Sequence, residues 1–269
     1  MEDLNRQYPA SRVCLFTQRH FRQNLKTSFP IGLCAGLVQV WWAELRKGND
    51  AMSSLRAPTP SLMRDVLLSQ AFSVYVTRLP ESDTGLSAAQ AQLLKLKYGQ
   101  ASLPEIEALQ RLFNVRSALE LDLVLQHELP ILERWEFEHF SRELVSELAQ
   151  NTQPGLYLLV ARYRSTEHNG RESGHRCALA VENGKTYRFY DPSLGEITFS
   201  AAEDFRNWFL GYLQINHWET LLQARTPSAP PIRIFHFGGA LSPAADERGV
   251  VLRKRLRTVN IDLDAWVPT

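Results

Sequence analysis

The feature that most constrains the fold is a change in hydrophobic periodicity near residue 151. Before it, Leu62, Val66 and Leu67 show the three-to-four spacing of an amphipathic helix, and helical patterning extends over residues 61–150. After a turn-forming stretch, apolar runs of strand length occur at residues 156–163, 176–181, 186–190 and 232–237 and from 250 onward. This separation of helices from strands predicts an α+β fold rather than βαβ alternation.

We expect a single domain over residues 1–269, with a helical part over about 1–150 and an antiparallel sheet over about 151–269. The 44% apolar and 22% charged residues are the balance of a globular chain that can bury a full core. Sequences typical of capping boxes predict helix starts at Ser87, Ser102 and Ser200. A further helix is expected over about residues 130–150.

Charge and cysteine content exclude several classes of function. The 30 basic and 29 acidic residues give a net charge of +1, which provides no overall field to attract nucleic acid. We interpret the basic run at 253–257 as the solvent-exposed face of a strand. Cys14, Cys34 and Cys177 are too few for a disulfide framework. The sequence contains no C-x-x-C pair, the spacing that would indicate a zinc site. We therefore expect no nucleic-acid partner and no structural metal.

Targeting and membrane signals are not expected either. The first residues lack the pattern of a Sec signal, and Glu2 occupies the position where N-myristoylation requires glycine. The longest uncharged stretch, residues 27–43, falls just short of the roughly 18 apolar residues that a membrane span needs. This stretch is interpreted as a buried helix.

Cys34 lies where a loop enters that helix, which makes it the candidate nucleophile. The unpaired N–H groups and the dipole at a helix start stabilise a thiolate and lower its pKa. Gly32 and Gly36 beside it would let a substrate carbonyl approach the sulfur, so they are the candidate substrate-binding residues. The alternative is a buried structural cysteine, which is our interpretation of Cys14 and Cys177.

A β-hairpin is predicted over residues 174–192, and its register decides whether His175 can meet Asp191. A two-residue Asn-Gly loop would place these two side chains on opposite faces of the sheet. A three-residue Glu-Asn-Gly loop pairs Val181 with Lys185 and sets His175 directly opposite Asp191, with Cβ atoms roughly 4.5–5.5 Å apart. We predict the three-residue loop.

At that distance, Asp191 would accept the Nδ1–H of His175, fix the tautomer of the ring and leave Nε2 to take a proton from Cys34. No other histidine of the seven shows a comparable partner in the sequence. The residues thus predict a Cys-His-Asp triad in which Cys34 is the nucleophile, His175 the base and Asp191 the group that orients the base.

Three separated segments of the chain resemble the YopT/AvrPphB-type cysteine proteases, papain-like enzymes that bacteria inject into host cells. They are residues 32–37 with Trp41, the pair Gly174-His175, and residues 190–196, where Ser193 stands in place of the asparagine common in that family. The resemblance implies a papain-like fold and the same three catalytic residues. It also implies that no cofactor is needed.

The second donor of an oxyanion hole is absent from its usual position. Papain-like enzymes tend to carry a Gln or Asn five or six residues before the nucleophile, where this chain has Ser28 and Phe29. The backbone N–H of Cys34 is one expected donor, and Ser28, Gln23 and Asn24 are the candidates for the other. Loss of one such donor typically lowers the rate by about 10²–10³.

The leading hypothesis is a peptidase that works through an acyl-enzyme on Cys34. The resemblance implies an effector made in the bacterial cytoplasm and secreted into the target-cell cytosol, where it would cut a host signalling protein such as a small GTPase or a kinase. A secretion chaperone is a further implied partner. Two alternatives stay open: the same residues could act on another amide, as in a glutamine deamidase, a transglutaminase-like enzyme or a cell-wall amidase, or the fold could be an inactive binding module.

Overall fold

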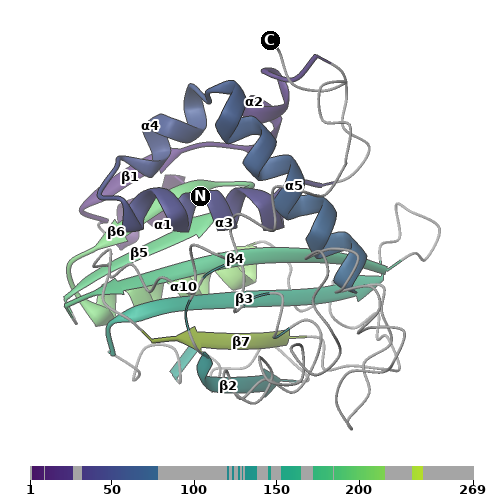
Figure 1. The fold of residues 1–269 in the computed structure, drawn as a ribbon. Coiled ribbons are helices and arrows are strands. Elements are labelled where there is room, and N and C mark those ends of the chain that lie inside the picture. The colour runs from purple at the N-terminus through teal and green to yellow at the C-terminus, as the bar shows by residue number, and fades with distance from the viewer. Residues whose placement is uncertain are drawn as a thin grey trace, which may run out of the picture. The chain divides into compact units, whose positions relative to one another are not determined.

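The computed structural model describes residues 2–8, 10–26, 32–77, 131–137, 145–146, 153–164, 172–183, 185–215 and 232–238, and single residues at 120, 123, 127 and 129. Figure 1 shows the helices and strands of these segments. The expected helix starts at Ser87 and Ser102 and the expected strand from residue 250 lie outside the described residues. So does the basic run at 253–257.

The helices are α1 (Glu2–Gln7), α2 (Gln18–Arg22), α3 (Cys34–Arg46), α4 (Ala51–Arg56), α5 (Pro60–Thr77) and α10 (Ala202–Ile215). The strands are β1 (Arg12–Leu15), β2 (Ile131–Phe137), β3 (Gly155–Arg164), β4 (Glu172–Glu182), β5 (Thr186–Asp191), β6 (Gly195–Phe199) and β7 (Ile232–Phe237). Helices and an antiparallel sheet occupy largely separate parts of the chain, so the predicted α+β class is confirmed.

The chain divides into two compact units. The sheet unit comprises Met1–Gln18 and Leu132–Leu241, and the helical unit comprises Arg19–Ile131 and Ser242–Thr269. Each unit is described by itself. The expectation of one domain over residues 1–269 stays a prediction.

A seven-stranded sheet forms the centre of the sheet unit, in the order β1-β6-β5-β4-β3-β7-β2 (Figure 1). β3 lies between β4 and β7 and pairs antiparallel with both. β1, from the N-terminus of the chain, pairs with β6 at one end of the sheet. The sequence predicted β3, β4, β5 and β7, whose apolar runs are long enough to show their own pattern.

The hairpin of β4 and β5 has a register that differs from the predicted one. Glu182 pairs with Thr186, so residues 183–185 connect the strands and the predicted pairing of Val181 with Lys185 is wrong. Asn183 adopts the left-handed conformation, with φ of 51°, which asparagine tolerates better than most residues. The loop is shifted along the chain by one residue, and this shift keeps His175 and Asp191 on the same face of the sheet.

That face is covered by α10, whose aromatic side chains form a cluster with those of the strands. Phe205, Trp208, Phe209 and Tyr212 of α10 all contact the ring of Phe189 on β5. Each of these rings is fully or almost fully buried, and burying one contributes roughly 1.5–3 kcal/mol. Packing against the sheet therefore fixes the position of α10. The acidic residues in its first turn favour a helix start there, close to the predicted start at Ser200.

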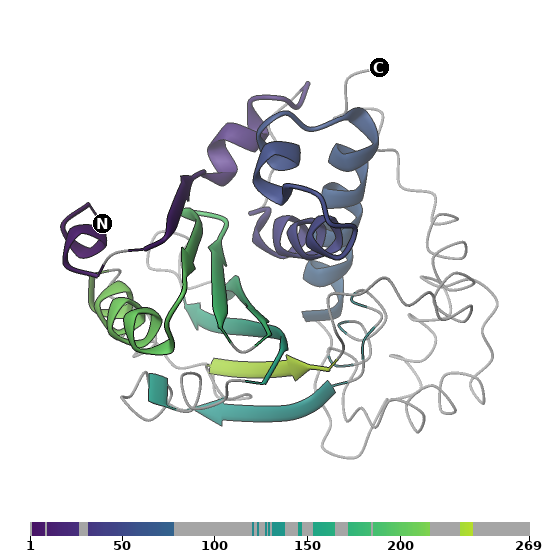
Figure 2. The same cartoon turned by 90° about the vertical axis from the view of Figure 1, so that its left-hand side faces the viewer.

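α1 packs beside α10 in the sheet unit (Figure 2). The indole Nε1–H of Trp208 donates to Asn5 Oδ1 at 2.8 Å. A Cβ on Gly211 would lie 2.3 Å from a methyl carbon of Leu4, so a side chain there would force the two helices apart. The N-terminal residues are thus part of the core of this unit.

The helix predicted over residues 130–150 is wrong for residues 131–137, which form β2. Leu, Glu and Arg in this segment favour a helix locally, but sheet pairing next to β7 outweighs that preference. Trp135 stacks on Tyr157 and His236 at 6.3 and 6.4 Å between ring centroids. Aromatic contacts with strands distant in the sequence thus stabilise the extended conformation.

In the helical unit, α3 packs against α5 at very short range. A Cβ on Gly36 would lie 2.0 Å from the carbonyl oxygen of Val66, so the two backbones can approach only because this residue is glycine. Trp41 and Trp42 are buried, which confirms that the uncharged stretch enters a buried helix. No helix in the described part of the chain is long and apolar enough to cross a membrane.

Candidate active site

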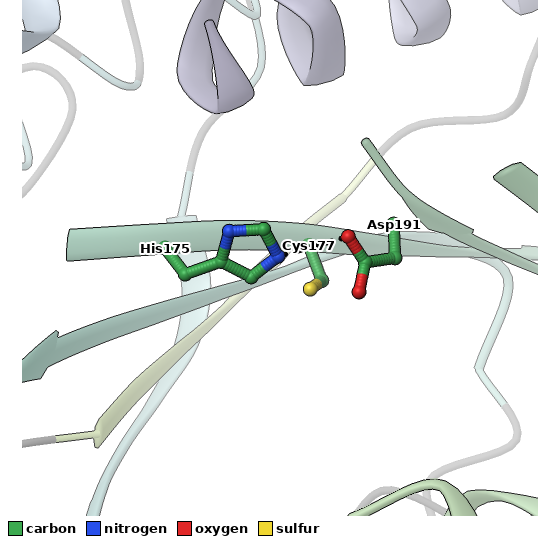
Figure 3. Close-up of side chains that lie close together, drawn as sticks. All are labelled: His175, Cys177 and Asp191. Atoms are coloured by element: carbon green, nitrogen blue, oxygen red, sulfur yellow. Dashed lines mark hydrogen bonds and ion pairs between the residues drawn. The ribbon is translucent and has the colours of Figure 1, made fainter. Parts of the chain in front are cut away.

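His175 on β4 and Asp191 at the end of β5 form the centre of the candidate site (Figure 3). The Nε2 of His175 lies 2.9 Å from Oδ1 of Asp191. Extending the hairpin register by one residue sets Cys177 across from Asp191, so His175 reaches the carboxylate diagonally. The two side chains meet as the sequence suggested, but through Nε2 of the ring rather than the expected Nδ1.

Asp191 is held from two further directions. The backbone N–H of Ser193 donates to Oδ1 at 2.7 Å, which is the local bond of an Asx turn. The hydroxyl of Tyr212, on α10, donates to Oδ2. Asp191 is 4% exposed, so these donors replace water and fix the direction in which its carboxylate faces His175.

The turn that follows Asp191 is tied to the N-terminal segment of the chain. The backbone N–H of Gln18 donates to the carbonyl of Pro192 at 2.7 Å, and that of Phe16 donates to Leu194 at 3.0 Å. Gly195 has φ of 115°, and a Cβ there would lie 2.1 Å from the carbonyl oxygen of Cys14. Glycine at position 195 therefore allows the segment 190–196 to lie close to β1.

The charges of the pair stabilise each other. Burial alone would lower the pKa of His175, but the Asp191 carboxylate outweighs it and raises that pKa well above its ordinary value. Burial alone would raise the pKa of Asp191, but the His175 charge and the hydrogen bonds from His175, Tyr212 and Ser193 lower it. An imidazolium is therefore favoured at neutral pH, and an imidazolium can stabilise a nearby thiolate.

Cys177 lies in this cluster, although the sequence gave it no role beyond packing (Figure 3). Its sulfur lies 3.8 Å from the Tyr212 hydroxyl, and it is 1% exposed. Burial, followed by the charge of Asp191, raises the pKa of this thiol to about 11. Cys177 is thus protonated at neutral pH and is a poor nucleophile despite its proximity to His175.

Side chains of His175, Cys177 and Asp191 could also act as metal ligands, because their donor atoms lie within 4.8 Å of one another. The chemistry of the set fits a hydrogen-bonded cluster better. Both oxygens of Asp191 already accept hydrogen bonds, and the raised pKa of Cys177 opposes the thiolate that a metal would require. The expectation of a metal-free site stays a prediction.

Cys34 is the first residue of α3 and is 9% exposed. It belongs to the helical unit, whereas His175 and Asp191 belong to the sheet unit. The predicted position at a helix start is confirmed. None of the cysteines Cys14, Cys34 and Cys177 forms a disulfide.

Some of the residues expected to bind the substrate or the oxyanion have other contacts in the structure. Gly36 is buried against α5, so the space beside it is filled by the Val66 carbonyl and is not open to a substrate. The Asn24 amide donates to the carbonyls of His20 and Phe21 at the end of α2. Gln23 is exposed, Gly32 is also exposed, and Ser28 lies outside the described residues.

Sequence reasoning missed two polar side chains, Tyr212 and Gln70. Tyr212 follows the apolar spacing of α10 and cannot be told from a core aromatic by sequence alone. Gln70, on α5, binds the first turn of α3 through its side-chain oxygen. A polar residue within an otherwise apolar helical pattern was the available signal, but no spacing rule links it to Cys34.

Comparison with known proteins assigns the family. Residues 15–226 match the model of the family Peptidase_C58, described as Yersinia/Haemophilus virulence surface antigen. Among solved structures, the chain is similar to the Pseudomonas avirulence protein AvrPphB, with 17% identity, a TM-score of 0.42, and coverage of 77% of this chain and 92% of that one. It is also similar to PatoxP, a cysteine protease-like domain of the Photorhabdus asymbiotica toxin PaTox, with 13% identity, a TM-score of 0.42, and coverage of 95% and 63%.

No curated protein matches the chain. The family match covers most of the 269 residues and includes Cys34 and the bonded pair of His175 and Asp191. The chain therefore belongs to the Peptidase_C58 family and is a cysteine peptidase.

Proposed function

We propose that this peptidase uses Cys34 as its nucleophile, His175 as its acid and base, and Asp191 to orient His175. The observation that carries the proposal is the buried bond between His175 Nε2 and Asp191 Oδ1 at 2.9 Å. Cys34 and this pair all lie within residues 15–226, the segment that matches the peptidase family. The proposal requires the helical and sheet units to meet as a papain-like catalytic domain with Cys34 facing the ring.

The geometry of the pair decides which ring nitrogen would meet the sulfur. Since Nε2 of His175 is bound to Asp191, Nδ1 is the atom that would face Cys34. Among the three cysteines, Cys34 is the one at the start of a long helix, where the helix dipole favours a thiolate. The burial of Cys177 and its pKa, which is raised to about 11, argue against this residue as the nucleophile.

The reaction would proceed in two acyl-transfer steps. The Cys34 thiolate attacks the peptide carbonyl, a carbon–sulfur bond forms, and the carbonyl π electrons move to oxygen. As this oxyanion collapses, the carbon–nitrogen bond breaks and the His175 imidazolium protonates the leaving amine. Neutral His175 then takes a proton from a water molecule whose oxygen attacks the thioester carbon. The carbon–sulfur bond breaks, the acid product leaves, and the pair of Cys34 thiolate and His175 imidazolium is restored.

We further infer that the substrate is a protein of a target cell and that the chain is a secreted effector. The family description, a virulence surface antigen, supports a role outside the producing cell. Delivery from the bacterial cytoplasm into the target-cell cytosol, the help of a secretion chaperone, and a small GTPase or a kinase as the substrate belong to the same proposal.

Expression in target cells tests the proposal. Wild type and Cys34→Ala would be compared by mass spectrometry for new peptide termini in host proteins and for one-dalton mass shifts. We expect termini that vanish in Cys34→Ala and persist in Cys177→Ala, the matched control for a buried thiol. One-dalton shifts would indicate a deamidase instead. Identical proteomes from cells that express wild type and cells that express Cys34→Ala would indicate an inactive binding module.

A further inference from the structure

The first turn of α3, which begins with Cys34, is bound by a side chain from another helix. Gln70 Oε1, on α5, accepts the backbone N–H of Ala35 at 2.9 Å and that of Gly36 at 3.1 Å. Leu33, at the N-cap position, provides no side-chain cap. Gln70 therefore satisfies N–H groups that a capping serine or aspartate would normally bind.

These two bonds also fix the orientation of the carboxamide. Because two N–H donors must face an acceptor, the oxygen of Gln70 points to the helix and the nitrogen occupies the other branch of the planar group. Gln70 is 4% exposed, and its side chain lies against Gly36, where a Cβ would approach Gln70 Cβ to 3.2 Å. The amide is thus held rigidly beside the first turn of the helix.

None of the hydrogen bonds between described residues uses the nitrogen of this carboxamide, and that nitrogen is not among the fully buried atoms that lack a partner. A carboxamide that is anchored through its oxygen keeps its N–H₂ group beside the first turn of α3, where it can donate to an acceptor from outside the chain. An oxygen atom that arrives with the substrate would provide such an acceptor.

We propose that Gln70 is a catalytic residue whose Nε2–H donates to the oxyanion that forms when Cys34 attacks a carbonyl. The inference rests on the proposed function, because it takes Cys34 as the nucleophile. It replaces Gln23 and Asn24 as candidate donors, since Gln23 is exposed and the Asn24 amide is engaged at the end of α2. A donor 36 residues after the nucleophile also explains why residues 28 and 29 carry no amide.

The donor is needed for one class of reaction and not for another. Acetylation of Cys34 by p-nitrophenyl acetate passes through a tetrahedral oxyanion: the carbon–sulfur bond forms, the carbonyl electron pair moves to oxygen, and p-nitrophenolate then leaves. Alkylation by iodoacetamide displaces iodide in one step, and no oxyanion forms. A missing oxyanion donor should therefore slow the first reaction alone.

The test uses two variants of the full chain. Gln70→Glu keeps an acceptor for the Ala35 and Gly36 N–H groups but has no donor, and Gln70→Met has neither. Rates of acetylation and alkylation at Cys34 would be followed by mass spectrometry, at a pH where the Cys34 thiol of each variant is fully ionised. Gln39→Met, on α3, is the matched control, and thermal melting verifies that each variant folds.

We expect acetylation to fall by about 10²–10³ in both Gln70 variants, with alkylation within twofold of wild type. Unchanged acetylation in Gln70→Met would overturn the proposal. A parallel fall of both reactions would also overturn it, because Gln70 would then only position the helix. If Cys34 of the wild type reacts with iodoacetamide no faster than Cys14, the proposed nucleophile itself is wrong and the donor assignment falls with it.

Discussion

The carboxylate of Asp191 controls the charge of His175, because burial and the carboxylate have opposite effects on the pKa of the ring. Asp191→Asn removes the carboxylate that opposes the effect of burial, so we expect the pKa of His175 to fall. Peptidase activity should decrease by about 10²–10⁴, the contribution of a positioned general acid and base. An NMR titration of the His175 ring measures the pKa. Glu203→Gln, which changes an exposed acid on α10, should leave that titration unchanged.

The same pair should give the folded state a pH dependence with two limits. His175 has a raised pKa, so its stabilisation is complete below its unfolded pKa of about 6.5 and is lost as pH rises through the folded value. Asp191 has a lowered pKa, so its stabilisation is complete above 3.8 and is lost as pH falls through the folded value. Urea melts should show the largest difference between wild type and His175→Gln near pH 5. A difference that grows toward pH 9 would contradict this sign.

Tyr212 acts on the site through Asp191, so we class it as a positioning residue. Tyr212→Phe removes one donor to the carboxylate, and we expect the pKa of Asp191 to rise and the acid limb of the pH–rate profile to move to higher pH. The kcat should fall about tenfold with little change in KM.

Tyr157→Phe provides the control for Tyr212, because it also removes a hydroxyl donor from a buried ring on the same face. The Tyr157 hydroxyl donates to the Gln153 carbonyl rather than to Asp191. Its loss should lower stability without moving the pH profile. Equal shifts in both variants would mean that the effect of Tyr212 is general destabilisation.

At the scale of elements, the contact of α3 with α5 depends on Gly36. In Gly36→Ala the new methyl group would lie 2.0 Å from the Val66 carbonyl oxygen, so the helices must separate. Overpacking of this kind costs about 1–3 kcal/mol, and the shift should also displace Cys34 and reduce activity. Urea melts measure the first effect and peptide hydrolysis the second. Gly48→Ala is the control, since nothing lies within 4 Å of its Cβ and only its left-handed φ of 76° is strained, and it should leave activity intact.

Elements with their own hydrophobic pattern could be predicted from sequence, and those made by distant partners could not. β3, β5 and α10 carry periodic apolar residues, so local patterning suffices. β1 has four residues and forms because β6, about 180 residues later, pairs with it. β2 was mistaken for a helix because its composition is helical and its aromatic contacts lie on other strands.

The candidate site shows the same division. His175 and Asp191 belong to one hairpin, and the predicted register placed both side chains on the same face of the sheet. That was enough to bring them together, although the predicted loop was displaced by one residue. Tyr212 contacts Asp191 from α10, and Gln70 contacts the first turn of α3 from α5, and in both cases the direction of the side chain depends on how its helix docks. Neither docking orientation follows from the sequence pattern of the helix itself.

At the scale of the whole molecule, the sheet unit includes the first 18 residues of the chain. Removal of residues 1–16 would eliminate β1 and the carbonyl of Cys14 and N–H of Phe16 that contact the turn after Asp191. We expect a large loss of stability and at least a tenfold loss of activity. Shortening by residues 1–3 alone is the comparison, because it leaves β1 and the contacts of Leu4 and Asn5 in place. Full activity without residues 1–16 would show that β1 is dispensable.

The pairing of β1 with β6 also has a consequence for biosynthesis. On the ribosome, residues 12–15 emerge early, but their partner Gly195–Phe199 is translated only after most of the chain. Contacts between residues so far apart form slowly, since a long loop must close first. The turn after Asp191 would therefore lack its contacts with β1 until residues 195–199 have left the ribosome, so the N-terminal segment of a nascent peptidase must wait for its partner strand.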